Sequence, residues 1–208
     1  KSIVPMNQMG LSESRMKTLR QMLARPYGIV IVTGPTGSGK TTTLYSILNE
    51  MNTESVNIMT LEDPVEYPMA RIRQASAADN PKMDFANGIR SMMRQDPDII
   101  LVGEIRDHET AEMAFRAAMT GHQVFSTLHA NSAVLAIPRL FDLGINASVM
   151  SGNLVGIVAQ RLVRLLCPAC KLPQACTEDE KSLLGLAPIE PFTIYRHVGC
   201  SACKGQGY

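Results

Sequence analysis

Residues 34–41, with the sequence GPTGSGKT, constrain this chain more than any other stretch. They fit the pattern G-x-x-x-x-G-K-[ST] at every fixed position, which is typical of a phosphate-binding loop. The glycines let several backbone N–H groups point at one anion, and the N-terminus of a following helix adds partial positive charge. In such a loop Lys40 reaches the β- and γ-phosphates of a nucleotide, and the Thr41 hydroxyl ligates Mg²⁺. The expected nucleotide contacts are Gly34, Pro35, Thr36, Gly37, Ser38, Gly39, Lys40, Thr41 and Thr42.

The segments on either side of this loop have the composition that such a loop requires. Residues 28–33 (GIVIVT) form a short apolar, β-branched run, which predicts a buried parallel strand. Residues 40–51 read as a helix. The alternative is a chance glycine-rich turn. The order strand, loop and helix favours the phosphate-binding loop and an α/β fold.

Composition and charge argue against several classes of function. At 208 residues the chain can bury a real core, as one domain or as one domain with a small appendage. The net charge is +1, so bulk charge gives no reason to expect nucleic acid as a partner. No apolar run approaches the roughly 18 residues needed to span a bilayer. Because the chain begins at Lys1 and ends at Tyr208 within an apparent turn, we interpret it as an excised part of a longer protein.

Helical patterns cover much of the chain. Ser12 is a suitable N-cap for a helix that runs to about Ala24. Residues 107–120 give the strongest pattern, with an acidic first turn, several alanines and Gly121 as the stop. In residues 147–166 apolar side chains recur at helical spacing. Further helices are expected at residues 84–95 and at residues 133–143, the latter interrupted by Pro138.

Carboxylates follow the second expected strand, residues 56–61. Glu62, Asp63 and Glu66 come just beyond it, and this end of a parallel strand faces the crevice where α/β proteins bind ligands. The alternative is an acidic turn, because Asp-Pro is a turn former. Beside a phosphate-binding loop we favour the ligand site. The next residues, 71–79, are polar and read as irregular.

Two further strands end in polar residues. Residues 98–102 form an apolar strand, and Glu104 follows it after one glycine. An acid in this position supplies the magnesium-side carboxylate of nucleotide hydrolases, although Glu104 and Asp107 also suit the start of a helix. Residues 122–128 form the fourth strand and lead directly to His129. A histidine there is either a structural residue or a contact of the γ-phosphate, and we favour the contact.

The last forty or so residues contain two CxxC pairs separated by residues 171–199. Two such pairs supply four thiolates for one tetrahedral Zn²⁺. The long separation implies an insertion of about one helix, at residues 178–184. A nucleotide-using context disfavours disulfides, and a redox CxxC would not need two copies. The candidate zinc ligands are Cys167, Cys170, Cys200 and Cys203, which leaves Cys176 as a free thiol.

Four ordered segments together resemble one family, the secretion ATPases of type II secretion and type IV pilus assembly. GPTGSGKTTTLY is similar to its Walker A motif, TLEDPVEY to its Asp box, RQDPDIILVGEIRD to its Walker B motif and TGHQVFSTLHAN to its His box. The resemblance runs from about Gly10 to Tyr208. The tetracysteine pair is similar to the general-secretion and pilus-extension branches and unlike the retraction and conjugation branches, which usually lack it.

The resemblance implies a RecA-like P-loop core with a mostly parallel central sheet and a small C-terminal zinc-binding lobe. It implies a cytoplasmic homo-hexamer, peripheral to the inner membrane, that hydrolyses ATP with Mg²⁺. This hydrolysis would move an inner-membrane platform protein that assembles pilin-like subunits. Glu66 would polarise the attacking water, Glu104 would act with Mg²⁺ directly or through water, and His129 and His122 would sense the γ-phosphate. Other implied nucleotide-site residues are Glu62, Asp63 and Arg106.

The chain departs from the family pattern at both ends. The family normally has an N-terminal domain whose arginines complete the site, and residues 1–10 are at most a remnant or linker. The ATPase core is then expected in residues 11–166 and the tetracysteine lobe in residues 167–208. We therefore expect the fragment to bind nucleotide while hydrolysing it poorly. Two other classes remain open, a nucleic-acid-directed motor on the same core and a scaffold that responds to ATP binding without turnover.

Overall fold

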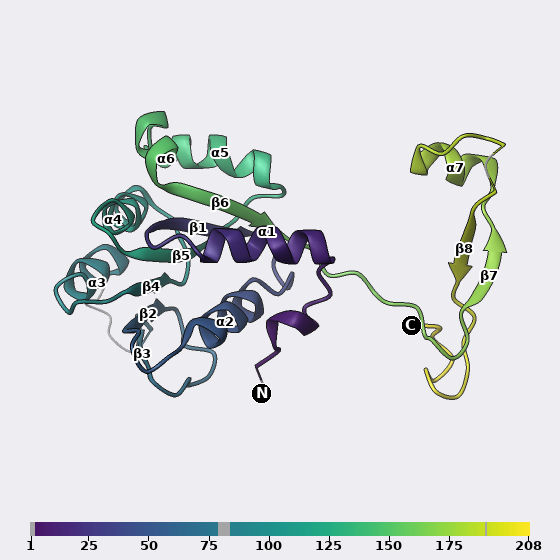
Figure 1. Cartoon of the computed structure of the whole chain (residues 1–208), viewed down its shortest axis with the longest axis horizontal. Coiled ribbons are helices and arrows are strands. Elements are labelled where there is room, and N and C mark those ends of the chain that lie inside the picture. The colour runs from purple at the N-terminus through teal and green to yellow at the C-terminus, as the bar shows by residue number, and fades with distance from the viewer. Residues whose placement is uncertain (1–2, 79–83, 190) are drawn as a thin grey trace. The chain divides into compact units, whose positions relative to one another are not determined.

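A computed structural model describes residues 3–78, 84–189 and 191–208 (Figure 1). The chain divides into two compact units, Lys1–Arg161 and Leu162–Tyr208. The expected N-terminal segment contains a short 3₁₀ helix, η1, at Met6–Gln8. Within the described residues, no helix combines the length and the apolar character needed to cross a bilayer.

A six-stranded sheet in the order β3-β2-β4-β5-β1-β6 forms the centre of the first unit. Every pairing in it is parallel, which confirms the predicted α/β fold. The phosphate-loop strand β1 lies between β5 and β6, and β4 lies next to β5. The strands are β1 Gly28–Thr33, β2 Ile58–Glu62, β3 Ile72–Ser76, β4 Ile99–Val102, β5 Gln123–Leu128 and β6 Leu154–Ala159.

Apart from α2, which follows the glycine-rich loop, the described α-helices of this unit begin at a residue whose side chain caps the helix. Ser12 accepts a hydrogen bond from the Arg15 N–H at 3.4 Å, and Asp107 accepts one from the Thr110 N–H at 2.8 Å. Both residues were predicted as possible helix starts. Helix α5 continues through Pro138. The helices are α1 Glu13–Leu23, α2 Lys40–Met51, α3 Phe85–Met92, α4 His108–Met119, α5 Ala133–Asp142 and α6 Ala147–Asn153.

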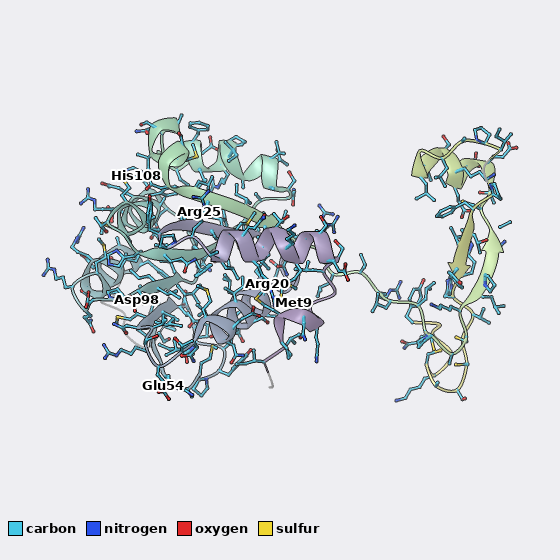
Figure 2. The ribbon with its side chains drawn as sticks, in the orientation of Figure 1. Met9, Arg20, Arg25, Glu54, Asp98 and His108 are labelled. Atoms are coloured by element: carbon cyan, nitrogen blue, oxygen red, sulfur yellow. The ribbon has the colours of Figure 1, made fainter. Side chains whose placement is uncertain are left out.

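The two faces of the sheet bury two separate apolar layers, as alternation along a strand requires. On one face, Ile29 and Ile31 of β1 pack with apolar residues of α3, α4, α5 and α6. On the other face, Val30 and Val32 pack with α1, α2 and η1 (Figure 1). On this second side Arg20 of α1, labelled in Figure 2, pairs with Glu50 of α2 at 3.2 Å. The result is a three-layer α/β/α unit whose inner strands β1, β2, β4 and β5 are buried on both faces.

Two expectations about the sheet were wrong. The helical pattern over residues 147–166 ends at Asn153, and residues 154–159 form β6 instead. Because this run is apolar apart from Gly156, the helical spacing carried no information, and its β-branched residues suit pairing with the edge of β1 that β5 does not occupy. Residues 72–76, expected as irregular, form β3. They are polar because β3 is an edge strand that is only partly buried. The last residue of that expected irregular segment, Asp79, lies outside the described residues.

The described residues of the second unit form a small two-stranded structure with one short helix. Strands β7 Leu172–Ala175 and β8 Thr193–Arg196 pair antiparallel. Between them α7 spans Glu178–Leu184, as the spacing of the cysteines predicted. It starts with a capping box in which Thr177 and Glu180 each bind the other's backbone N–H. The expected domain boundary after Leu166 stays a prediction, whereas the compact units divide after Arg161.

Candidate functional site

The glycine-rich loop connects the buried strand β1 to helix α2. Gly37 and Gly39 have φ values of 76° and 88°, which side chains with a Cβ rarely adopt. Gly39 is the N-cap of α2, so the first backbone N–H groups of the helix have no side-chain cap. The Lys40 ammonium donates to the carbonyl oxygens of Gly34 at 3.0 Å and Pro35 at 3.1 Å. The lysine therefore lies over the loop, with Thr41 and Thr42 exposed in the first helical turn.

Gln160, which the sequence did not single out, supports the loop from the end of β6. Its side-chain amide donates to the Ser38 carbonyl at 2.6 Å, and its backbone N–H donates to the Thr33 carbonyl at 3.0 Å. A Cβ at Gly34 would lie 2.4 Å from the Gln160 carbonyl oxygen, so only glycine fits there. The Ser38 hydroxyl is buried and has no partner in the described part of the chain. An unsatisfied hydroxyl in an amide-lined loop suits a phosphate oxygen as its acceptor.

The ends of β4 and β5 bring an acid and a base together at the same edge of the sheet. His129 Nε2 lies 2.8 Å from Glu104 Oε1. Gly103, just before Glu104, passes close to β2, and a Cβ there would make a tight contact of 3.2 Å with the Glu62 Cα atom. At the end of β1, the Thr33 hydroxyl accepts the Ala130 N–H at 2.9 Å. Thr33 thereby holds the segment that carries His129 next to the start of the phosphate loop.

Arg106 adds a positive charge to this edge. Its Nε donates to Glu104 Oε2 at 2.8 Å, and its Nη1 lies 3.9 Å from Asp63 Oδ2. With His129 on the other carboxylate oxygen, both oxygens of Glu104 have basic partners. The four side chains form a row across the ends of three neighbouring strands. Glu104 is the most buried of the four, with 17% of its side chain exposed.

Glu62 and Glu66, predicted together, lie in different environments. Glu62 is 4% exposed, and its carboxylate accepts hydrogen bonds from the hydroxyls of Tyr45 and Thr60 and from the Gln74 amide. Burial, followed by the hydrogen bond to Glu62, raises the pKa of Tyr45 far above its usual range. Glu66 is exposed. Its side chain is therefore accessible to solvent, whereas that of Glu62 is held inside the fold.

His122 does not join this group. Its Nδ1 lies 3.0 Å from the Ala117 carbonyl and 3.1 Å from the Thr120 hydroxyl, just before β5 begins. The phosphate loop lies at the other end of the sheet, because Gly28 pairs with Gln123 at the start of β1. A six-residue strand spans about 16 Å between its first and last residues, at about 3.3 Å per residue. The structure therefore separates His122 from His129.

The second unit brings the four predicted zinc ligands together. The Sγ atoms of Cys167, Cys170, Cys200 and Cys203 all lie within 4.8 Å of one another. Cys203 Sγ lies 3.8 Å from the Sγ atoms of both Cys170 and Cys200. This matches the spacing of about 3.8 Å expected for sulfurs about 2.3 Å from a tetrahedral Zn²⁺. Cys176 is buried elsewhere, and its N–H donates to the Phe192 carbonyl at 2.9 Å.

Backbone N–H groups point at these sulfurs. Gly199 N–H reaches Cys170 Sγ at 3.3 Å, while the N–H groups of Cys200 and Gly207 reach Cys203 Sγ at 3.2 Å and 3.1 Å. The Cys200 N–H makes the largest contribution in lowering the pKa of Cys203 to about 6, whereas the pKa of Cys170, which the Gly199 N–H lowers, is raised to about 11 because burial and the three neighbouring thiols outweigh that hydrogen bond. Donors of this kind stabilise thiolates, which are the form that binds metal. The donor set thus fits Zn²⁺.

A parallel sheet with an amide-lined glycine loop after β1, and with charged side chains on the neighbouring strand ends, defines a P-loop nucleotide-binding protein. Over residues 1–208 the chain matches the family described as "Type II/IV secretion system protein". The chain belongs to this family, which confirms the resemblance found in the sequence.

Relatives carry names from both secretion and pilus assembly. Type II secretion system protein E of Pseudomonas aeruginosa (strain PAO1) is 50% identical over 203 residues, covering 98% of this chain and 40% of that protein. The type IV pilus assembly ATPase PilB of Myxococcus xanthus is 49% identical over 207 residues, covering 98% of this chain and 36% of that protein. The chain thus spans well under half the length of these relatives.

Solved structures of related ATPases share the fold. The pilus retraction motor PilT with bound ADP matches at a TM-score of 0.70 and 40% identity, over 78% of this chain and 49% of that one. The ATPase DotB of Legionella pneumophila matches at a TM-score of 0.63 and 27% identity, over 93% of this chain and 50% of that one. These matches agree with a nucleotide-binding core of the kind that the geometry defines.

Proposed function

We propose that this chain binds ATP with Mg²⁺ at residues 34–42 and hydrolyses it to ADP and phosphate. The observation that carries the proposal is the shared sheet edge, where the phosphate loop after β1, His129 after β5 and Glu104 after β4 come together. Lys40 and the N-terminus of α2 supply positive charge to the β- and γ-phosphates. The Thr41 hydroxyl and the Glu104 carboxylate would hold Mg²⁺, directly or through water, and the ion would neutralise charge on the phosphates.

Glu66 is the group that we assign to orienting the attacking water. It is exposed at the acidic end of β2, where its carboxylate can accept a proton from water, whereas Glu62 is buried and occupied. His129 would sense the γ-phosphate from its place beside Glu104. Asp63 and Arg106 complete the charged row, and Arg106 can exchange Glu104 for a phosphate oxygen. His122 has no role in this proposal, since it lies at the far end of β5.

In the second unit the four cysteines would hold one Zn²⁺ with a structural role. A closed set of four thiolates leaves no position for a substrate. The N–H groups directed at the sulfurs would disperse the charge of the thiolates.

The function of the whole protein follows from its relatives. Their names join the family to type II secretion and to type IV pilus assembly. We propose that ATP turnover powers the assembly of type IV pili or secretion pseudopili, in a cytoplasmic homo-hexamer peripheral to the inner membrane. The partner would be a platform protein in that membrane.

Replacing Lys40 tests the site. We expect Lys40→Ala to lower ATP turnover by a factor on the order of 10²–10³, because it removes a preorganised charge beside the transferred phosphoryl group. Phosphate release measures the rate, and a fluorescent ATP analogue measures affinity. Lys17→Ala, an exposed lysine of α1, is the matched control and should leave both unchanged. Wild-type turnover in Lys40→Ala would exclude the assigned site.

A further inference from the structure

Tyr45 occupies an unusual position between the phosphate loop and the acidic end of β2. It lies on α2, five residues after Lys40, and its side chain is 0% exposed. Five residues of α-helix rise about 7.5 Å, so the tyrosine lies roughly one and a half turns below the loop. The helix that carries Lys40 and Thr41 therefore also carries Tyr45 as a rigid body.

The Tyr45 hydroxyl makes three hydrogen bonds with residues from outside its own helix. It donates to Glu62 Oε2 at 2.5 Å. It accepts the backbone N–H of Glu66 at 3.3 Å and the side-chain amide of Gln74 at 3.4 Å. The ring packs edge-on against Tyr67 with the ring centroids 4.7 Å apart. One hydroxyl thus contacts both β2 and the segment that follows it.

The surroundings of Glu62 explain why this hydroxyl is held so firmly. A buried carboxylate is costly unless several donors surround it. Glu62 receives the Tyr45 hydroxyl, the Thr60 hydroxyl at 2.6 Å and the Gln74 amide at 3.3 Å. Gln74 also accepts the Met69 N–H at 2.6 Å, so the network extends beyond the acidic segment. A network satisfied in this way fixes the orientation of each member.

We propose that Tyr45 is a positioning residue, which fixes the main chain of Glu66 relative to the phosphate loop. The hydroxyl, anchored by Glu62, holds the Glu66 N–H, while the Glu66 carboxylate stays free to reach solvent. The water-orienting group and the phosphate cradle thereby share one rigid support. This inference rests on the role assigned to Glu66 above.

The test is Tyr45→Phe, which keeps the ring and removes the hydroxyl. A displacement of a catalytic group by about 1 Å can cost up to about 100-fold in rate. We expect kcat for ATP hydrolysis to fall about 10- to 100-fold, while the Kd of a fluorescent ATP analogue changes less than about twofold. Tyr67→Phe is the matched control, because its ring packs on Tyr45. It should leave kcat unchanged.

A double-mutant cycle with Glu66→Gln separates positioning from a general structural role. If Tyr45 acts through Glu66, Tyr45→Phe will lower kcat in the wild-type background and have little further effect beside Glu66→Gln. An equal fall in both backgrounds, an unchanged kcat, or a loss of nucleotide affinity that matches the loss of kcat would overturn the inference. If Glu66→Gln alone keeps wild-type turnover, the assigned role of Glu66 fails and this inference fails with it. If Glu66→Gln is impaired and Tyr45→Phe is not, only the inference fails.

Loss of the Tyr45 hydroxyl removes one hydrogen-bond donor to the buried Glu62 carboxylate and can destabilise the fold. A second variant therefore distinguishes a loss of positioning from a loss of folding. Tyr45→Phe/Glu62→Gln also removes the buried negative charge, and removing both partners costs less stability than removing one. We expect this double variant to melt close to the wild type and still show the low kcat. A folded double variant with wild-type kcat would overturn the inference.

Discussion

The two units of the chain are stabilised by different means. The first unit buries two apolar layers against a parallel sheet, with Phe125 and Phe115 at 0% and 1% exposure. In the described part of the second unit the only buried apolar side chains are Cys167 and Cys176. Large apolar residues there, such as Leu183 at 87% exposed, face solvent.

The difference shows what each unit needs in order to fold. A unit of more than 150 residues can bury enough apolar surface to offset the conformational entropy of its chain. A unit of fewer than 50 residues cannot, and such units usually depend on disulfides or metals. The second unit instead gathers the sulfur atoms of four cysteines into one cluster. The metal site is therefore expected to be the core of the second unit.

Removing the metal should produce the largest difference in stability between the two units. Binding of structural Zn²⁺ is worth about 10–16 kcal/mol in zinc-finger peptides, and this energy is folding energy. We expect a chelator to abolish hydrogen-exchange protection of the Gly199, Cys200 and Gly207 amides, which point at sulfur. Peptides from β1 and β5 should keep their protection. Equal protection of residues 162–208 with and without metal would contradict the comparison.

A large-to-small substitution should destabilise the first unit more than the second, which is the opposite of the effect expected from metal removal. Phe125→Ala in β5 should destabilise the first unit by about 3–5 kcal/mol, because it leaves a cavity in a fully buried layer. Phe192→Ala is the matched change in the second unit, where the side chain is 43% exposed. It should cost less than about 1 kcal/mol. Urea unfolding followed by circular dichroism measures both, and similar losses would mean that the second unit has an apolar core.

Removing a helix cap should have the smallest effect on stability, and this effect should differ between a helix of the second unit and a helix of the first. Thr177→Ala removes one half of the capping box of α7 and should cost about 1 kcal/mol locally. Ser12→Ala removes the corresponding cap of α1, which is packed through Leu19 on the core. We expect exchange protection to fall in α7 and to change little in α1. Loss of protection in α1 alone would show that α7 is held by contacts other than its cap.

Local sequence patterns predicted most of the helices and strands correctly. They were wrong where the secondary structure of a segment depended on its position in the tertiary structure. The strand, loop and helix of residues 28–51 have the predicted bounds. A strand buried on both faces and a glycine-rich turn each have a sequence pattern that lies within the segment itself. Residues 154–159 were interpreted as helix and residues 72–76 as irregular, yet both form strands at the two edges of the sheet. Whether such a segment forms an edge strand depends on the strand with which it pairs. That partner lies elsewhere in the chain, so the local sequence pattern carries no information about it.

The candidate site divides in the same way. Lys40, Glu104 and His129 could be predicted as site residues from the sequence, because each lies in a short motif that follows the end of an expected strand. Tyr45 and Gln160 were not singled out. A tyrosine inside a helix and a glutamine after an apolar run are ordinary in sequence. Their contacts exist only because α2 and β6 pack beside the ends of β2 and β1.

By itself the sequence determined that this chain has a glycine-rich loop of the phosphate-binding pattern, acidic and basic residues after its strands, and four cysteines spaced for one metal ion. These features depend on spacings of a few residues, within which the backbone leaves little freedom. The tertiary structure decided which of the acids is buried and which is exposed, and that His122 lies apart from His129. Such outcomes depend on strand order and register, which bring together residues far apart in the chain and separate residues that lie near one another in it.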